Sequence, residues 1–324
     1  MTVPTALPVE QRTRVGLLFL YGACMTRYDK SALEYDEILS MLKERGLVIL
    51  NDNRAVDCLR TVSYFRLANY FRPMEEDKKT HVFKTGSFFE SAIDLYEFDQ
   101  ELRSILFDAT QNIEIALRSK MIHLISLKYG AFWFADASLF YDVEIFESCM
   151  QHLRHEVERS REDFIIEHLK RYSEPDIPPV WKTLEVATFG TLSKLLCNFK
   201  DSSMKKRIAR EFDLPQHKVL ENWIKCMVTL RNHIAHHSRI WNRNFPNIPQ
   251  TNVSLKGAWL SQSIQHSHKL YSYLCCIQYM LNSINDANDF PQNLSTLFDK
   301  YPNSDLQAMG IPQDWKTEEL WCRC

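Results

Sequence analysis

The chain is poor in glycine and has no glycine-rich phosphate loop. Eight glycines in 324 residues are few, and the twelve prolines lie mostly between long periodic segments. This distribution favours helices joined by short connections over a fold rich in strands and tight turns. The missing glycine-rich loop excludes a P-loop nucleotide site. A His-Glu-x-x-His motif is also absent, which excludes a zinc protease site of that type. We therefore expect an all-α protein.

Cysteine spacing typical of a metal site is lacking as well. Nine cysteines are scattered along the chain, apart from the adjacent Cys275 and Cys276 and the terminal Cys322 and Cys324. An odd number without regular spacing is typical of reduced thiols in a protein interior. We expect no metal, no cofactor and a cytoplasmic location.

No apolar run is long enough to cross a bilayer, which needs about 20 residues. The longest candidate, residues 15–24, follows Arg12 and Arg14 and superficially resembles a signal peptide. Because Met25 would make a natural start, we interpret residues 1–24 as a dispensable extension, with a signal peptide as the alternative. We expect no membrane contact.

The chain as a whole has no excess of positive charge. Its formal net charge of −2 excludes a protein that coats nucleic acid over its entire surface. Residues 200–243, however, contain ten basic and four acidic residues, a net charge of +6. Any nucleic-acid contact should therefore be local, and this segment is the candidate.

Hydrophobic periodicity divides the chain into helical segments. The longest periodic run, from about Phe88 to Lys128, contains no proline and predicts one long central helix, or two helices broken near residues 88–94. A capping box at Ser31 predicts a first helix over residues 32–45, and the aromatic segment Tyr64–Phe71 should pack with it as a hairpin. Further helices are expected over residues 146–172, 180–199, 204–212, from about 216 onward, and 260–284.

Residues 230–243 combine three arginines, three histidines and two asparagines. Arginine stays charged at any working pH, and histidine can take and give a proton near neutrality. If the preceding helix continues through this stretch, Asn232 and His236 stand four residues apart on one face. His236 would transfer protons, Arg231 would stabilise the transition state, and Asn232 would orient the imidazole or the phosphate.

These residue types can cleave RNA without metal, because the 2′-hydroxyl of RNA supplies the nucleophile. The products would be a 2′,3′-cyclic phosphate and a 5′-hydroxyl. In a continuous helix, Arg239 and Arg243 would extend the stripe of Asn232 and His236. The candidate RNA-binding residues are His237, Arg239, Arg243, Lys205, Lys206, Arg207 and Arg210.

Simpler interpretations stand beside these. The motif is also compatible with a solvated helix end, since an arginine followed shortly by histidine occurs again at Arg118 and Arg161. Arg118 more simply forms a buried ion pair with Glu114. The carboxylates around Asp99 are typical of a solvated helix face, and the aromatics of Tyr64–Phe71 favour a core over base stacking.

Several stretches together resemble the Abi-like family, the AbiD and AbiF group of bacterial abortive-infection proteins in the HEPN superfamily of helical ribonucleases. The similar stretches are residues 42–47, Ser63–Tyr70, Leu95–Arg103, Ile113–Arg118, Pro179–Trp181 with Thr188–Ser193, and Leu230–Arg243. The HEPN motif, an arginine, a polar residue, three to five others and a histidine, matches Arg231, Asn232 and His236.

The resemblance implies a HEPN-like helical bundle with an N-terminal helical hairpin and a C-terminal helical extension. The resemblance covers roughly residues 28–245, and we expect a helical domain over residues 25–285 and a C-terminal tail over 286–324. It also implies RNA as substrate, a homodimer whose two motifs form one site, and antiphage defence with a possible antitoxin or phage trigger. The alternatives are a non-catalytic dimer that senses RNA or a phage protein, and a nucleotide-binding partner of a transferase.

Overall fold

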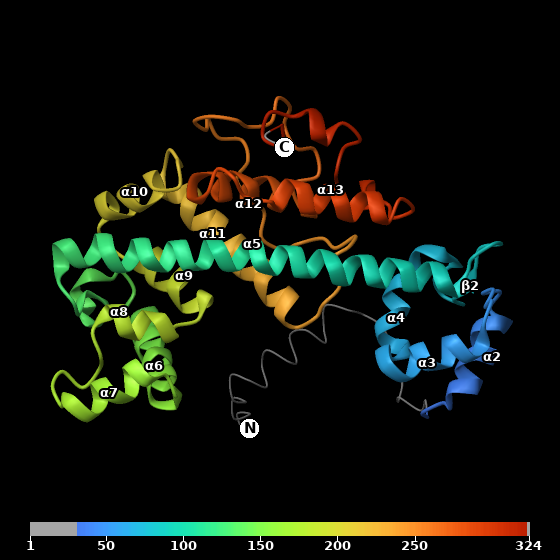
Figure 1. The fold of residues 1–324 in the computed structure, drawn as a ribbon, viewed down its shortest axis with the longest axis horizontal. Coiled ribbons are helices and arrows are strands. Elements are labelled where there is room, and N and C mark those ends of the chain that lie inside the picture. The colour runs from blue at the N-terminus through green and yellow to red at the C-terminus, as the bar shows by residue number, and fades with distance from the viewer. Residues whose placement is uncertain (1–30, 323–324) are drawn as a thin grey trace, which may run out of the picture.

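The computed structural model describes residues 31–322, which form twelve α-helices, six short 3-10 helices and one two-stranded sheet (Figure 1). The expected all-α fold is confirmed, and residues 1–24 lie outside the described part of the chain. The helices are α2 (Tyr35–Glu44), α3 (Asp52–Val62), α4 (Tyr64–Phe71), α5 (Phe89–Tyr129), α6 (Val143–Arg159), α7 (Asp163–Arg171), α8 (Val180–Thr183), α9 (Phe189–Asn198), α10 (Ser202–Arg210), α11 (His217–Ala235), α12 (Leu270–Ile284) and α13 (Phe290–Lys300). Strands β1 (Glu75–Asp77) and β2 (Val82–Phe83) pair antiparallel.

Helix α5 is the axis of the fold. It is unbroken over 41 residues, so it is about 60 Å long, and the predicted long central helix is confirmed. Helices α4, α9, α10, α11, α12 and α13 all pack against it. Phe98, Leu106 and Leu117 are among its fully buried residues. Their shared contacts with α5 therefore fix the positions of these six helices relative to one another.

Two hydrophobic clusters lie along α5. The main cluster joins most of α5 to α6 and to α8–α13, and the N-terminal cluster joins α2–α4 and β2 to the first turns of α5. Leu95 packs against both clusters. Tyr70 and Phe71 are buried in the N-terminal cluster, as the core interpretation of the aromatic segment expects, whereas Phe65 is 85% exposed.

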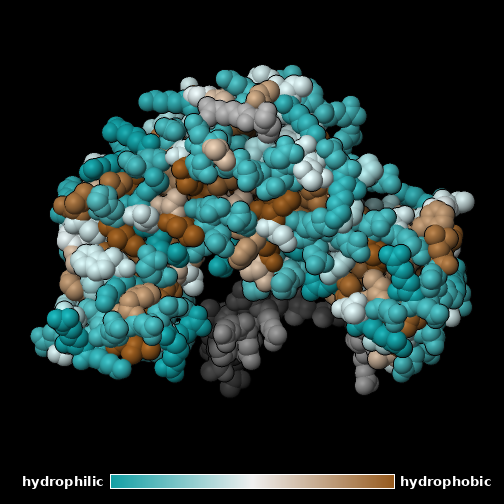
Figure 2. All heavy atoms as spheres, in the orientation of Figure 1, coloured by the Kyte–Doolittle hydropathy of each residue, from teal (hydrophilic) through white to brown (hydrophobic). Residues whose placement is uncertain are grey.

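The two ends of the molecule project to the same side of α5 (Figure 1). Helices α6–α8 form one end and α2–α4 the other, and the space-filling view shows a hollow between them (Figure 2). The last turns of α11 project on this concave side, between the two ends (Figure 1). The end of α11 therefore lies between the two projecting ends of the fold.

Some predicted boundaries are wrong. The first helix begins at Tyr35, because its capping box is formed by Glu34 and Glu37 and does not involve Ser31. Residues 146–172 form two helices, since Ser160 and Glu162 have extended backbone and the Ser160 hydroxyl accepts a hydrogen bond from the Glu162 amide.

The segment set apart as a C-terminal tail packs with the main cluster. It carries α13, which contacts α5, and it contributes Leu294, Trp315 and Leu320 to the core. Among residues 31–322, no helix combines the length and the apolar character needed to cross a membrane.

Candidate functional site

Helix α11 carries the predicted catalytic residues at its C-terminal end. Its buried face is formed by residues at three- and four-residue spacing, among them Trp223, Met227, Leu230 and Ile234, and burial of this face fixes the rotation of the helix about its axis. Asn232 and His236 are exposed. The side chain of Arg231 is 33% exposed, so all three residues can be reached from solvent.

The helix ends at Ala235, earlier than expected. His236 is the C-cap residue, and its amide still donates to the Asn232 carbonyl at 3.0 Å. Asn232 and His236 therefore keep the helical spacing, but the predicted stripe through Arg239 and Arg243 is wrong, because those residues follow the helix in irregular structure.

Local capping helps to end the helix here. His237 has φ 52°, in the left-handed region that glycine usually occupies. The amides of His237 and Ser238 donate to the carbonyls of Ile234 and His233, each at 2.9 Å. These two bonds form a Schellman motif, which satisfies carbonyl groups at the helix end.

A buried carboxylate fixes the backbone that follows the motif. The Asp99 carboxylate accepts hydrogen bonds from the amides of Ile240 (3.1 Å) and Trp241 (2.6 Å) and from the Tyr70 hydroxyl (2.6 Å), and it pairs with Arg103. Asp99 is fully buried, so its interpretation as part of a solvated face is wrong. Burial raises the pKa of the Asp99 carboxyl, and the surrounding donors oppose that rise.

A second acidic residue of α5 lies beneath the motif arginine. Arg118 Nη2 lies 2.8 Å from Glu114 Oε1, which confirms the expected ion pair, and it also donates to the Ala187 carbonyl at 3.0 Å. The other carboxylate oxygen of Glu114 lies 3.9 Å from Arg231 Nε. Glu114 therefore forms an ion pair with Arg231, and part of the Arg231 side chain remains exposed to solvent.

Cations gather on the other side of the motif. Arg66, on α4, donates to the carbonyl of His237 at 2.6 Å, and Arg243 Nε donates to the carbonyl of Arg239 at 2.6 Å. Burial lowers the pKa of the Arg239 guanidinium, and nearby Arg243 lowers it further. The pKa of His233 is lowered by burial and then by Arg243 and His236. Positive charges are thus close together at the end of α11.

The predicted RNA-binding residues of α10 divide into two kinds. Lys206, Arg207 and Arg210 are exposed. The side chain of Lys205 is only 2% exposed, and its ammonium lies 2.8 Å from a carboxylate oxygen of Glu221. The prediction for Lys205 is therefore wrong, because this cation is enclosed in the protein.

The structure does not bring the α10 residues next to the motif. Lys205 contacts Glu221 near the start of α11, and Arg231 lies ten residues further along the helix, about 15 Å away along the axis. It does bring Arg66 to the motif, a residue that sequence reasoning missed. No local signal marks that contact, since Arg66 and His237 are 171 positions apart.

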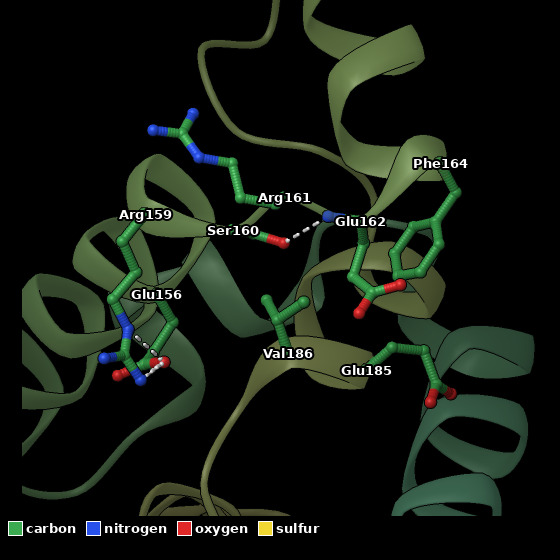
Figure 3. A pocket seen from close by; sticks show the side chains of 8 residues that line it. All are labelled: Glu156, Arg159, Ser160, Arg161, Glu162, Phe164, Glu185 and Val186. Atoms are coloured by element: carbon green, nitrogen blue, oxygen red, sulfur yellow. Dashed lines mark hydrogen bonds and ion pairs between the residues drawn. The ribbon is translucent and has the colours of Figure 1, made fainter.

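A pocket of about 530 Å³ lies elsewhere, between α6 and α7 (Figure 3). Its charged lining consists of Arg159, Arg161 and three carboxylates, those of Glu156, Glu162 and Glu185. The guanidinium of Arg159 turns back onto Glu156, 2.6 Å away (Figure 3). With one cation neutralised and carboxylates in excess, this pocket is unsuited to phosphate.

A metal centre has no support from side-chain geometry in the described ranges. No group of three or more His, Cys, Asp or Glu side chains in residues 31–322 lies close enough together to hold a metal ion.

Comparison with known proteins identifies the family. Searches among curated proteins and among solved structures find no significant match. The sequence model of the family described as Abi-like protein matches residues 57–242. That match covers α5, α11, the Asp99 and Glu114 contacts and the motif residues Arg231, Asn232 and His236. The chain belongs to the Abi-like protein family.

Proposed function

We propose that this protein is a metal-independent endoribonuclease of an abortive-infection system. Membership of the Abi-like family supports the defence role. The observation that carries the nuclease proposal is the exposure of Asn232 and His236 beside an arginine that Glu114 supports from beneath.

The proposed reaction uses each of the three residues. The 2′-oxygen attacks the phosphorus as an imidazole takes the 2′-hydroxyl proton, and the bond from phosphorus to the 5′-oxygen breaks as that oxygen receives a proton. Arg231 stabilises the charge on the non-bridging oxygens, and Asn232 orients the phosphate or His236. The His236 side chain is exposed, so its imidazole can reach a bound RNA strand.

Two protons move in this reaction, one taken and one given, and each chain supplies one such motif. We therefore propose that two copies of the chain place their motifs together, so that one His236 acts as base and the other as acid. His236 is the exposed C-cap residue of α11, and the last turns of α11 lie on the concave side of the molecule (Figure 1), so a second copy and RNA would approach it from that side.

The test is His236→Ala. We expect a loss of RNA cleavage of about 10²–10⁴-fold, loss of toxicity on induced expression, and an unchanged circular dichroism spectrum. Wild-type cleavage should persist in EDTA and should leave 2′,3′-cyclic phosphate ends, which sequencing of RNA ends detects. His155→Ala is the matched control, because it removes another exposed imidazole, from α6.

Equal RNA breakdown by wild type and His236→Ala would refute the proposal. If purified wild type binds RNA and leaves it intact, a non-catalytic sensing role takes its place. Arg231→Ala would then weaken binding without changing any cleavage.

A further inference from the structure

A cavity of about 450 Å³ lies beside the motif and has an unusual charge composition. Its lining comes from two distant parts of the chain: the segment after α4 with the β1–β2 hairpin, and the segment after α11. The lining residues are Arg72, Pro73, Glu75, Lys78, Lys84, Arg239 and Asn242. Four of the seven are cations and one is a carboxylate, so the cavity has a strong excess of positive charge.

These cations lack an acidic partner at bonding distance in the described part of the chain. Within residues 31–322, none of Arg72, Lys78, Lys84 and Arg239 forms an ion pair. Lys84 donates to the Pro73 carbonyl at 3.0 Å, which leaves its charge uncompensated.

The nearby acids form no ion pair with these cations. One oxygen of Glu75 is bonded to His81 at 3.0 Å, and its other oxygen is buried without a hydrogen-bond partner among the described residues. Asp99 is close enough to Arg239 to influence it, but its oxygens accept bonds from Tyr70 and the backbone after the motif.

The fold holds these charges together against repulsion. Arg239 is half-buried, and its pKa is lowered by burial, by Arg243 and by Arg72. Lys269 next to it has a pKa lowered by burial and by Arg239. An anion in the cavity would relieve this repulsion, because Coulomb interactions are stronger in a partly buried site than in water.

The cavity is close to the predicted cleavage site. Arg239 follows His236 by three residues, and Arg66, which binds the His237 carbonyl, lies six residues before Arg72, about 9 Å along a helix. The motif and the cavity are therefore connected through α4 and through the short segment after α11.

We propose that this cavity binds a backbone phosphate of the RNA whose neighbouring linkage is cleaved. Arginine offers a fork of donors that matches phosphate oxygens, and lysine adds point charge. No aromatic side chain from residues 31–322 lines the cavity, so these residues offer no surface on which a base could stack. The contact therefore holds the strand without reading its sequence. This inference rests on the proposed ribonuclease function and adds the position of a second phosphate.

The test measures RNA binding in the full chain carrying His236→Ala, so that the RNA stays intact. Anisotropy of a labelled random-sequence RNA pool is followed at increasing KCl in the parent, in Arg72→Ala with Lys84→Ala, and in Lys79→Ala. Lys79 is the matched control, since it is exposed on the same hairpin and does not line the cavity.

We expect the double variant to lower the slope of log affinity against log salt by about 0.7 for each phosphate charge that the protein no longer neutralises. Its affinity should fall several-fold, while Lys79→Ala matches the parent. Inorganic phosphate at equal ionic strength should displace RNA no better than KCl. If it displaces RNA at low concentration, free phosphate is the ligand and the proposal is wrong.

An unchanged salt slope in a folded double variant overturns the inference. Lys84→Glu is a further variant for the same measurement, because reversal of the charge should weaken RNA binding more than its removal. Wild-type cleavage is measured separately. If RNA binds and the slope falls but wild type never cleaves, the nuclease proposal fails and the phosphate site stands.

Discussion

The two ends of α11 hold their cations in opposite ways. At the start of the helix, Lys205 and Lys218 both bond to Glu221, at 2.8 Å and 3.0 Å. Burial raises the pKa of the Glu221 carboxyl, but these two lysines hold that pKa below its ordinary value. At the end of the helix, Arg243 disfavours the charged form of Arg239, and neither arginine has an ion-pair partner among the described residues.

This difference separates cations that stabilise the fold from cations that are available to a ligand. Paired charges satisfy each other and hold α10 against α11. Charges that stay crowded and partly buried without a partner reduce the stability of the native state, which is typical of a functional site. The position of the nearest carboxylate therefore indicates whether a cation is available to a ligand, and the number of arginines and lysines in a segment does not.

The largest expected effect is on the backbone after the motif. Asp99→Asn replaces an acceptor of several hydrogen bonds with an amide, and it leaves Arg103 without its anion. We expect a loss of about 3–5 kcal/mol in the free energy of unfolding, measured by urea denaturation. Cleavage should fall even where the variant is fully folded, because Ile240 and Trp241 lose their anchor. A folded variant with wild-type activity would show that the anchor does not position the site.

The next largest effect is expected on stability, when Lys205 is replaced at the start of α11. Lys205→Met fills the same space but leaves the buried Glu221 with only Lys218. We expect the free energy of unfolding to fall by roughly 3 kcal/mol, and the salt dependence of RNA binding to stay the same. Lys206→Met, on the exposed side of α10, is the control for stability. A reduced salt slope in Lys205→Met would contradict its structural role.

The opposite result is expected at the end of α11. Arg243→Met removes one of the crowded charges, so the free energy of unfolding should stay within about 0.5 kcal/mol of wild type. RNA affinity should nevertheless fall several-fold, as measured by anisotropy in the His236→Ala background. A strongly destabilised variant would mean that Arg243 holds the fold through its bond to the Arg239 carbonyl.

The smallest effect concerns histidine titration. The pKa of His233 lies below its ordinary value because of burial and Arg243, so the folded state disfavours its protonated form. Stability should therefore decrease as pH falls from about 7 toward 5, because the unfolded chain binds more protons over that window. In an NMR titration, Arg243→Met should raise the pKa of His233. No change would show that Arg243 does not contribute to the lowered pKa of His233.

Much of the fold could be predicted from local pattern. The apolar periodicity of α5 and α11 is strong, and both helices form where it occurs. The motif residues Arg231, Asn232 and His236 were found through residue chemistry and resemblance, and the structure leaves them accessible. These features depend on neighbours a few residues apart, which a sequence displays directly.

What could not be predicted depends on partners far along the chain. The end of α11 has no glycine or proline, and the backbone after it is anchored by Asp99, more than 140 positions away. Lys205 looks like any surface lysine until Glu221 is placed beside it. Asp99 looks like a solvated carboxylate until Tyr70 and Trp241 surround it.

Helix α5 also limits where this chain can tolerate insertions and deletions. Asp99 and Glu114, which hold the two sides of the motif, are 15 residues apart on this unbroken helix, roughly 22 Å. One inserted or deleted residue between them would rotate one anchor by about 100° relative to the other. Length changes should therefore be tolerated in the connections around α6–α8, and not between these two carboxylates.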